Sequence, residues 1–272
     1  MSTIKLLVVD LDGTTVGESN QIESVVQQAI QAAQAQGVQV AIATGRMYRS
    51  ALRFHETLGS TLPLMAYQGA LIKNPTDGKL LRHWTVDQDR ARQLLDYFEA
   101  PEVSADISVH FYIDDQLYVR EITAETVLYS QRSGVDAIAV GDLRTMLDAD
   151  LTKILVQSAD VPLINRLLAD LRQRYAPDQL YLTKSVDTFL EAANPSVNKG
   201  VAVRYLAEEL LGLTPDQVMT IGDNFNDVEM IQYAGTGIAM GNAPADVQAI
   251  ADWVAPTVAQ HGVAIAIEKF VL

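Results

Sequence analysis

Residues 5–14 read Lys-Leu-Leu-Val-Val-Asp-Leu-Asp-Gly-Thr, a short apolar run that ends in two carboxylates and a glycine. A nearly continuous apolar run of this length is typical of a strand buried on both faces of a parallel sheet. Gly13 permits a tight turn, which would place Asp10 and Asp12 just beyond the strand. One carboxylate of such a pair can attack as a nucleophile while the other transfers a proton. A loop that caps a helix is the alternative interpretation.

The segments after this turn alternate between helical and strand patterns. The predicted elements are a helix at 22–36, a strand at 38–43, a helix at 48–58 and a strand at 64–67. The same rhythm resumes late in the chain, with a helix at 198–211, a strand at 218–221, a helix at 227–234, a strand at 237–240 and a helix at 245–250. Strands that alternate with helices predict right-handed crossovers and a doubly wound parallel sheet. The expected fold class is therefore α/β.

The middle of the chain has a different pattern. Turn-forming residues between short apolar runs predict hairpins at 70–84 and 109–119, with helices between other short strands. We therefore expect an α+β domain at residues 84–188, inserted into an α/β core formed by residues 1–83 and 189–272.

The composition limits the classes of function. The net charge is −14, which disfavours nucleic acid and anionic membranes as partners. Cysteine is absent, so disulfides and thiolate chemistry are excluded. No apolar run approaches the roughly 18–20 residues that span a bilayer, and no secretory leader is visible. We expect a cytoplasmic protein whose oligomeric state cannot be inferred from its sequence.

Three more polar clusters accompany the strand patterns of the α/β part. Thr44-Gly45-Arg46 could hold phosphate oxygens through a hydroxyl and backbone N–H groups, although a plain helix cap fits as well. Lys199 begins a helix and could place a charge on an anion, although most lysines are solvated. Asp223 and Asp227 offer the hard oxygen ligands that Mg²⁺ prefers. Ligands bind at the carboxyl ends of parallel strands, so these clusters can converge there.

Taken in order, these motifs resemble those of the haloacid dehalogenase (HAD) superfamily. The set is Asp-x-Asp-Gly-Thr, Thr-Gly-Arg, Lys199 and Gly-Asp-x-x-Asn-Asp, and it is followed by Gly-Ile-Ala-Met-Gly-Asn-Ala at 237–243. The long insertion resembles the cap domain of the Cof-type sugar-phosphatase branch. The resemblance covers the whole chain and implies a HAD-like core with an inserted α+β cap. It also implies a Mg²⁺-dependent phosphatase that forms a phospho-aspartate.

The resemblance further implies a role for each motif residue. Asp10 would be the nucleophile and would bind Mg²⁺ together with Asp223 and the backbone carbonyl of Asp12. Asp12 would also be the general acid and base. Asp227 would orient metal-bound water or Lys199, a catalytic residue. The phosphoryl and substrate groups would be bound by Leu11 through its backbone N–H, Thr44, Gly45, Arg46, Gln68, Lys199 and Asn226.

One residue departs from the pattern of this branch. Gln68 stands where the branch usually has an asparagine, which keeps the carboxamide but adds a methylene group. If this group contacts the substrate in members of the branch, its reach is altered here, and the effect on substrate preference stays open.

Several functions remain open on these residues. The expected substrates are small phosphorylated metabolites, with sugar phosphates first and flavin or pyridoxal phosphates as alternatives. A sucrose-phosphate phosphatase, a phosphosugar mutase and a binding protein without catalysis are the other candidates. The motif groups are all retained, which disfavours the last of these.

Overall fold

The structure is a computed structural model that describes residues 4–272, and these residues form two compact units. The core unit comprises residues 4–82 and Asn198–Leu272, and the inserted unit comprises His83–Val197. The second boundary differs from the expected residue 189, because the strand at Phe189–Ala193 pairs antiparallel with two strands of the inserted unit. A strand pattern does not reveal its pairing partner, so the sequence misplaced this segment.

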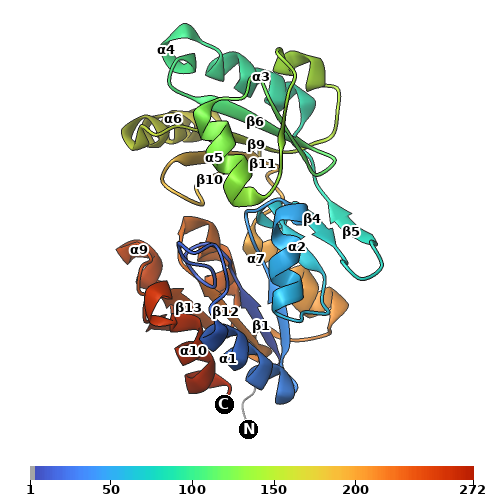
Figure 1. The fold of residues 1–272 in the computed structure, drawn as a ribbon, viewed down its shortest axis with the longest axis vertical. Helices are drawn as coiled ribbons and strands as arrows, with labels where there is room; N and C mark the ends of the chain where they lie inside the picture. Colours follow the sequence, from blue (N-terminus) through green and yellow to red (C-terminus); the bar gives the residue numbers. More distant parts are fainter. Residues whose placement is uncertain (1–3) are drawn as a thin grey trace. The chain divides into compact units, whose positions relative to one another are not determined.

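A five-stranded parallel sheet forms the centre of the core unit (Figure 1). In spatial order its strands are β14 (Trp253–Ala255), β13 (Thr236–Met240), β12 (Val218–Gly222), β1 (Leu6–Val9) and β2 (Gln39–Ile42). The side chains of β1 are fully buried, and the strand lies in the interior of the sheet between β12 and β2. The α/β fold class and the buried first strand are confirmed.

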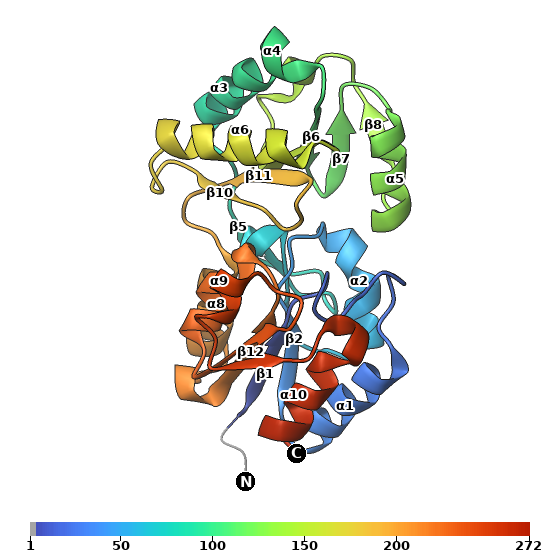
Figure 2. The same cartoon turned by 90° about the vertical axis from the view of Figure 1, so that its left-hand side faces the viewer.

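Helices cover both sides of this sheet. They are α1 (Ser24–Ala35), α2 (Tyr48–Thr57), α7 (Lys199–Arg204), α8 (Val228–Tyr233), α9 (Ala245–Gln248) and α10 (Gly262–Phe270). Figure 2 shows α1 beside α10. Ile231 of α8 and Val247 of α9 belong to one apolar cluster with Ala239 of β13. Val26, Ile30 and Ala33 of α1 are buried at helical spacing, as the apolar pattern predicts.

Three parts of the core unit differ from the prediction. The helix expected to 211 ends its α-helical part at Arg204 and continues as a π-helical turn over Tyr205–Leu210. β14 and α10 were not predicted. α10 opens with Gly-Val-Ala-Ile-Ala-Ile, and the five apolar residues in a row after the glycine carry no helical period.

The strand predicted at 64–67 forms, but it joins a different sheet from the one expected. β3 (Leu64–Ala66) pairs antiparallel with β4 (Leu71–Lys73), which adjoins β5 (Leu80–His83) in a separate three-stranded sheet. An isolated parallel bridge between Ala43 and Met65 still connects β3 to the segment after β2. The end of β3 is therefore placed beside the end of β2, as a parallel neighbour would be.

The inserted unit is a mixed sheet with helices, the expected α+β architecture. In spatial order its strands are β10 (Tyr181–Thr183), β11 (Phe189–Ala193), β9 (Leu151–Gln157), β6 (Ser108–Ile113), β7 (Gln116–Val119) and β8 (Ala137–Ala139). Its helices are α3 (Gln88–Phe98), α4 (Pro101–Ser104), α5 (Ala124–Ser133) and α6 (Val161–Arg174). Side chains such as Phe98, Ile154 and Leu167 form one apolar cluster between α3, α6 and the sheet. Within residues 4–272, no helix has both the length and the apolar composition needed to cross a membrane.

Candidate active site

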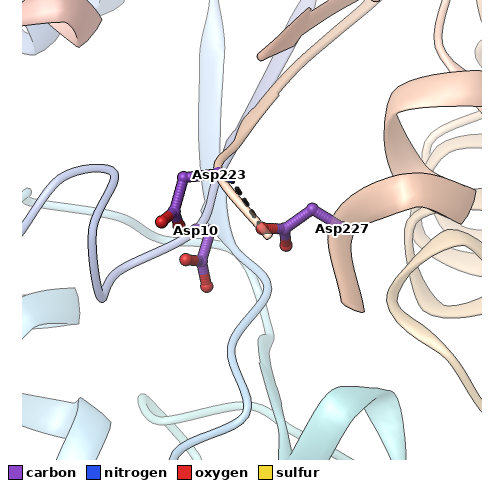
Figure 3. Close-up of side chains that lie close together, drawn as sticks. All are labelled: Asp10, Asp223 and Asp227. Atoms are coloured by element: carbon purple, nitrogen blue, oxygen red, sulfur yellow. Dashed lines mark hydrogen bonds between the residues drawn. The ribbon is translucent and has the colours of Figure 1, made fainter. Parts of the chain in front are cut away.

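Two neighbouring strands of the core sheet deliver the first two carboxylates. Asp10 follows β1 and Asp223 follows β12, and these strands pair in parallel with Val9 opposite Ile221. Figure 3 shows both side chains lying close to that of Asp227. One carboxylate oxygen from each of the three residues lies within 4.8 Å of the others. Motifs that are distant in the sequence therefore meet at one point.

Lys199 lies within this carboxylate cluster. Its side chain is fully buried, and its Nζ donates to Asp10 Oδ1 at 2.6 Å and to Asp227 Oδ1 at 2.6 Å. The start of α7 fixes its position, since the Asn198 side chain caps the helix by accepting from the Val201 N–H at 2.8 Å. The ammonium of Lys199 thus lies buried between the carboxylates of Asp10 and Asp227, and its expected contact with phosphoryl oxygens stays a prediction.

Asp227 uses both carboxylate oxygens within the protein. Oδ1 accepts from Lys199, and Oδ2 accepts from the backbone N–H groups of Asp223 at 2.8 Å and Asn224 at 3.0 Å. The dashed line in Figure 3 marks the first of these backbone bonds. Asp227 therefore orients Lys199 and shapes the turn that carries Asp223. Asp10 and Asp223 are the better candidates for direct contact with a cation.

The carboxylate cluster carries more negative than positive charge when its three carboxyl groups are ionised. Burial raises the pKa of Asp10 to about 7, although Lys199 opposes the shift. Burial also raises the pKa of Asp223 to about 8, and the charges of Asp10 and Asp227 add to it. Burial alone would lower the pKa of Lys199, but Asp10 and Asp227 outweigh it and raise this pKa. Three carboxylates and one ammonium leave an excess of negative charge, which a divalent cation would balance.

The turn after β1 is packed directly on Asp223. Gly13 has φ +80°, and a Cβ added there would lie 2.2 Å from Asp223 Oδ2. The Thr14 hydroxyl donates to Asp223 Oδ1 at 3.1 Å. The carbonyl of Leu11 closes the turn by accepting from several following N–H groups, that of Thr15 at 2.9 Å among them. Glycine is required at position 13 for both its backbone conformation and its lack of a side chain.

Asp12 has a partner that the sequence did not indicate. Both of its oxygens accept from Arg46, from Nε and from Nη2, each at 2.7 Å. Arg46 Nη2 also donates to Asn20 Oδ1 at 2.8 Å, while Nη1 is buried without a hydrogen-bond partner among residues 4–272. The guanidinium expected to bind phosphate is thus engaged with the expected acid and base. A two-point Arg–carboxylate contact across the fold has no sequence signature.

The remaining expected binding residues form one connected group. The backbone N–H of Gln68 donates to the Thr44 carbonyl at 2.9 Å, and the Thr44 hydroxyl accepts from the Arg46 N–H at 3.1 Å. Gln68 Oε1 accepts from Asn226 Nδ2 at 3.0 Å, which leaves Asn226 Oδ1 buried without a partner among residues 4–272. A Cβ on Gly45 would lie 2.5 Å from Gln68 Nε2. Gln68 itself is fully buried and has φ 60°.

Comparisons with known proteins agree with this geometry. The sequence profile of the family described as haloacid dehalogenase-like hydrolase matches residues 7–267. The chain belongs to this family. This HAD-like hydrolase is 31% identical to the Bacillus subtilis protein YxeH, in a match that spans 98% of each chain. It is 28% identical, over 97% of each chain, to B. subtilis YitU, which is named a 5-amino-6-(5-phospho-D-ribitylamino)uracil phosphatase.

Solved structures of the HAD family resemble this one over nearly the whole chain. A haloacid dehalogenase-like hydrolase from B. subtilis superimposes with a TM-score of 0.84 at 26% identity, covering 97% of this chain and 99% of its own. The expected superfamily, its Cof-type branch and an enzyme of the phosphatase class are confirmed by these matches.

Proposed function

We propose that this HAD-like hydrolase is a Mg²⁺-dependent phosphatase that transfers the phosphoryl group of a small metabolite to Asp10 and then to water. The convergence of Asp10 and Asp223 beside a buried lysine supports this proposal most strongly. A binding protein would not need a carboxylate nucleophile held by a buried ammonium. A group placed in this way is positioned to attack phosphorus.

The residues present fit a magnesium ion. The donors that converge are carboxylate oxygens, and the carboxylates outnumber the nearby ammonium group. We propose Asp10, Asp223 and the backbone carbonyl of Asp12 as its protein ligands. Asp227 would hold Lys199 and the backbone of Asp223 in place through its hydrogen bonds. A bound Mg²⁺ would neutralise the negative charge that phosphoryl transfer spreads over the phosphate oxygens.

The chain's own groups would carry out two chemical steps. An oxygen of Asp10 forms a bond to phosphorus, and the bond from phosphorus to the leaving oxygen breaks as Asp12 protonates that oxygen. Asp12 then removes a proton from water, which attacks phosphorus and releases phosphate from Asp10. Lys199 keeps the carboxylate of Asp10 oriented throughout, through its bond at 2.6 Å.

The contact between Asp12 and Arg46 adds a requirement to this sequence. Both oxygens of Asp12 accept from the guanidinium, so at least one of these bonds has to open before Asp12 can exchange a proton. We propose that the guanidinium of Arg46 lies over the phosphoryl site once its hydrogen bonds to Asp12 have opened. It would lie there beside Thr44, Gly45 and the backbone N–H of Leu11. Its buried Nη1, which has no hydrogen-bond partner in the part of the chain that the structure describes, is a donor available for an anionic oxygen.

The proposed substrates are phosphorylated sugars and polyols. The name of the relative YitU refers to an aminouracil whose ribityl chain, a polyol chain, carries the phosphate. We propose that Gln68 and Asn226 lie near the substrate, as their connected and buried carboxamides suggest.

Phosphate release from a panel of phosphorylated metabolites tests the proposal. We expect release with Mg²⁺, none with EDTA, and a loss of several orders of magnitude in Asp10→Asn. Mass spectrometry of acid-quenched enzyme should locate a phosphate on Asp10. Transfer of that phosphate to a second substrate molecule, without free phosphate, would identify a mutase instead. Binding of substrates with no turnover in the wild type would identify a non-catalytic binding protein.

A further inference from the structure

Asn242 bridges three loops beside the carboxylate cluster. It follows β13, the neighbour of β12 in the sheet. Its Nδ2 donates to the Gly13 carbonyl at 2.9 Å and to Asp223 Oδ2 at 3.3 Å. Its Oδ1 accepts from the Val258 N–H at 2.9 Å. One carboxamide therefore connects the turn after β1, the loop after β12 and the loop after β14.

Backbone groups on both sides determine the orientation of this carboxamide. The Val258 N–H can only donate, so it requires the oxygen of the amide. The Gly13 carbonyl can only accept, so it requires the nitrogen. A flipped amide would lose both bonds. The donor of Asn242 therefore faces Asp223 as a matter of hydrogen-bond chemistry.

This donor completes the support of the Asp223 carboxylate. Thr14 donates to Oδ1 and Asn242 donates to Oδ2, so both oxygens are held from the side of the protein. The same amide holds the carbonyl of Gly13, whose Cα lies so close to Asp223 that a Cβ would clash at 2.2 Å. The turn that carries Asp10 and the loop that carries Asp223 are thus fastened together.

We propose that Asn242 is a positioning residue for the divalent cation, holding Asp223 and the turn after Asp10 at the separation that one shared ion requires. This inference rests on the proposed metal site. Hydrogen-bond partners of metal ligands typically change metal affinity by about 10–100-fold when they are removed. Asn242 does not touch the phosphoryl group or the leaving group in this proposal, so its effect is on metal binding.

The neighbouring Gln248 provides a matched control. Its Nε2 donates to the carbonyls of Gly241 at 3.2 Å and Ala243 at 2.9 Å. It therefore supports the same loop as Asn242, but these bonds reach neither Asp223 nor Gly13. Gln248→Ala measures the cost of loosening the loop, and Asn242→Ala adds the loss of the bond to Asp223.

The test is calorimetric titration of the full-length wild type and both variants with Mg²⁺ alone, without substrate. We expect the dissociation constant to rise by about 10–100-fold in Asn242→Ala and by less than about threefold in Gln248→Ala. At saturating Mg²⁺, kcat and the KM for substrate of Asn242→Ala should return close to wild type. Asn242→Asp keeps an acceptor for Val258 but lacks the donor, so it should not recover the wild-type profile.

Equal Mg²⁺ affinity in Asn242→Ala and wild type would overturn the inference. Equal weakening in both loop variants would also overturn it, because a loosened loop would then be the cause. A wild type that binds no Mg²⁺ would instead overturn the proposed metal site, and the inference with it. Wild-type binding is therefore measured first, which separates the two failures.

Discussion

Replacing Lys199 by methionine should destabilise the core unit, and the loss should grow with pH. The substitution keeps an unbranched side chain that is one atom shorter, and it removes two buried hydrogen bonds of 2.6 Å, to Asp10 and Asp227. Removing one partner from a buried ion pair typically costs about 3–5 kcal/mol, because the other charge is left uncompensated. We expect that loss in the free energy of unfolding at pH 8, in EDTA.

The pH dependence follows from the sign of the carboxylate shifts. Burial of a carboxyl group can raise its pKa in the folded protein above its value in the unfolded chain. The free energy of unfolding then falls as pH rises from the unfolded pKa to the folded pKa. Asp10 already has a pKa raised to about 7 with Lys199 present. Without the ammonium this pKa rises further. Above about pH 7 the Asp10 carboxyl is ionised in the wild type but still protonated in the variant, so the variant should lose about 1.4 kcal/mol per pH unit more than wild type there. The penalty at pH 5.5 should therefore be clearly smaller than at pH 8.

Urea unfolding followed by tryptophan fluorescence measures this effect. The chain has two tryptophans, and Trp84 lies in the inserted unit while Trp253 lies in the core unit. In a Trp84→Phe background the signal reports the core unit alone. Lys153→Met is the matched control, because Lys153 pairs with Glu191 at 2.7 Å in the inserted unit.

Two outcomes would refute the reasoning about Lys199. One is a variant within about 1 kcal/mol of wild type at pH 8, since an unpaired buried carboxylate should cost more. The other is a penalty of equal size at pH 5.5 and pH 8. A loss in the core-unit signal of the Lys153→Met control would show that the two units do not report separately.

Three further predictions concern the same structure. Gly13→Ala should weaken Mg²⁺ binding measured by calorimetry, because its Cβ would lie 2.2 Å from Asp223 Oδ2. Gly59→Ala should leave the binding unchanged, because Gly59 has φ +61° but its added Cβ would meet no atom of residues 4–272 within 4 Å. Mg²⁺ affinity should increase from pH 6 to pH 8, since the pKa values of Asp10 and Asp223 are raised to about 7 and about 8 and both protons must leave; a constant affinity would contradict this. Burial lowers the pKa of His110 to about 3, so the stability of the inserted unit should decline by about 1.4 kcal/mol per unit as pH falls below about 6.5, in urea unfolding; His110→Phe should remove this slope.

The sequence predicted an element correctly where the pattern of apolar residues in a segment matches the way that segment is buried. Leu6–Val9 is apolar throughout and buried on both faces of the sheet, and such an apolar run is typical of a buried parallel strand. α1 shows its buried side through helical spacing. α10 begins with an unbroken apolar run that has no period, so it could not be recognised.

Pairing between segments could not be read in the same way. The sequence predicts the strand at 64–67 and assigns the segment from 189 to the core, but β3 joined a separate antiparallel sheet and β11 joined the inserted unit. A strand exposes the same backbone donors and acceptors to any neighbour, so only packing of the whole chain selects the partner.

The sequence by itself determined which chemical groups this hydrolase carries in its motifs. Asp10, Asp223 and Lys199 are recognised from the few residues around each of them and from the order of the motifs along the chain. Only the tertiary structure decided which atoms of these groups touch. The bonds from Arg46 to Asp12 and from Asn242 to Gly13 join loops that are 34 and 229 residues apart in the chain. Side-chain hydrogen bonds act over about 3 Å, and separations of that size are set by the packing of strands and helices.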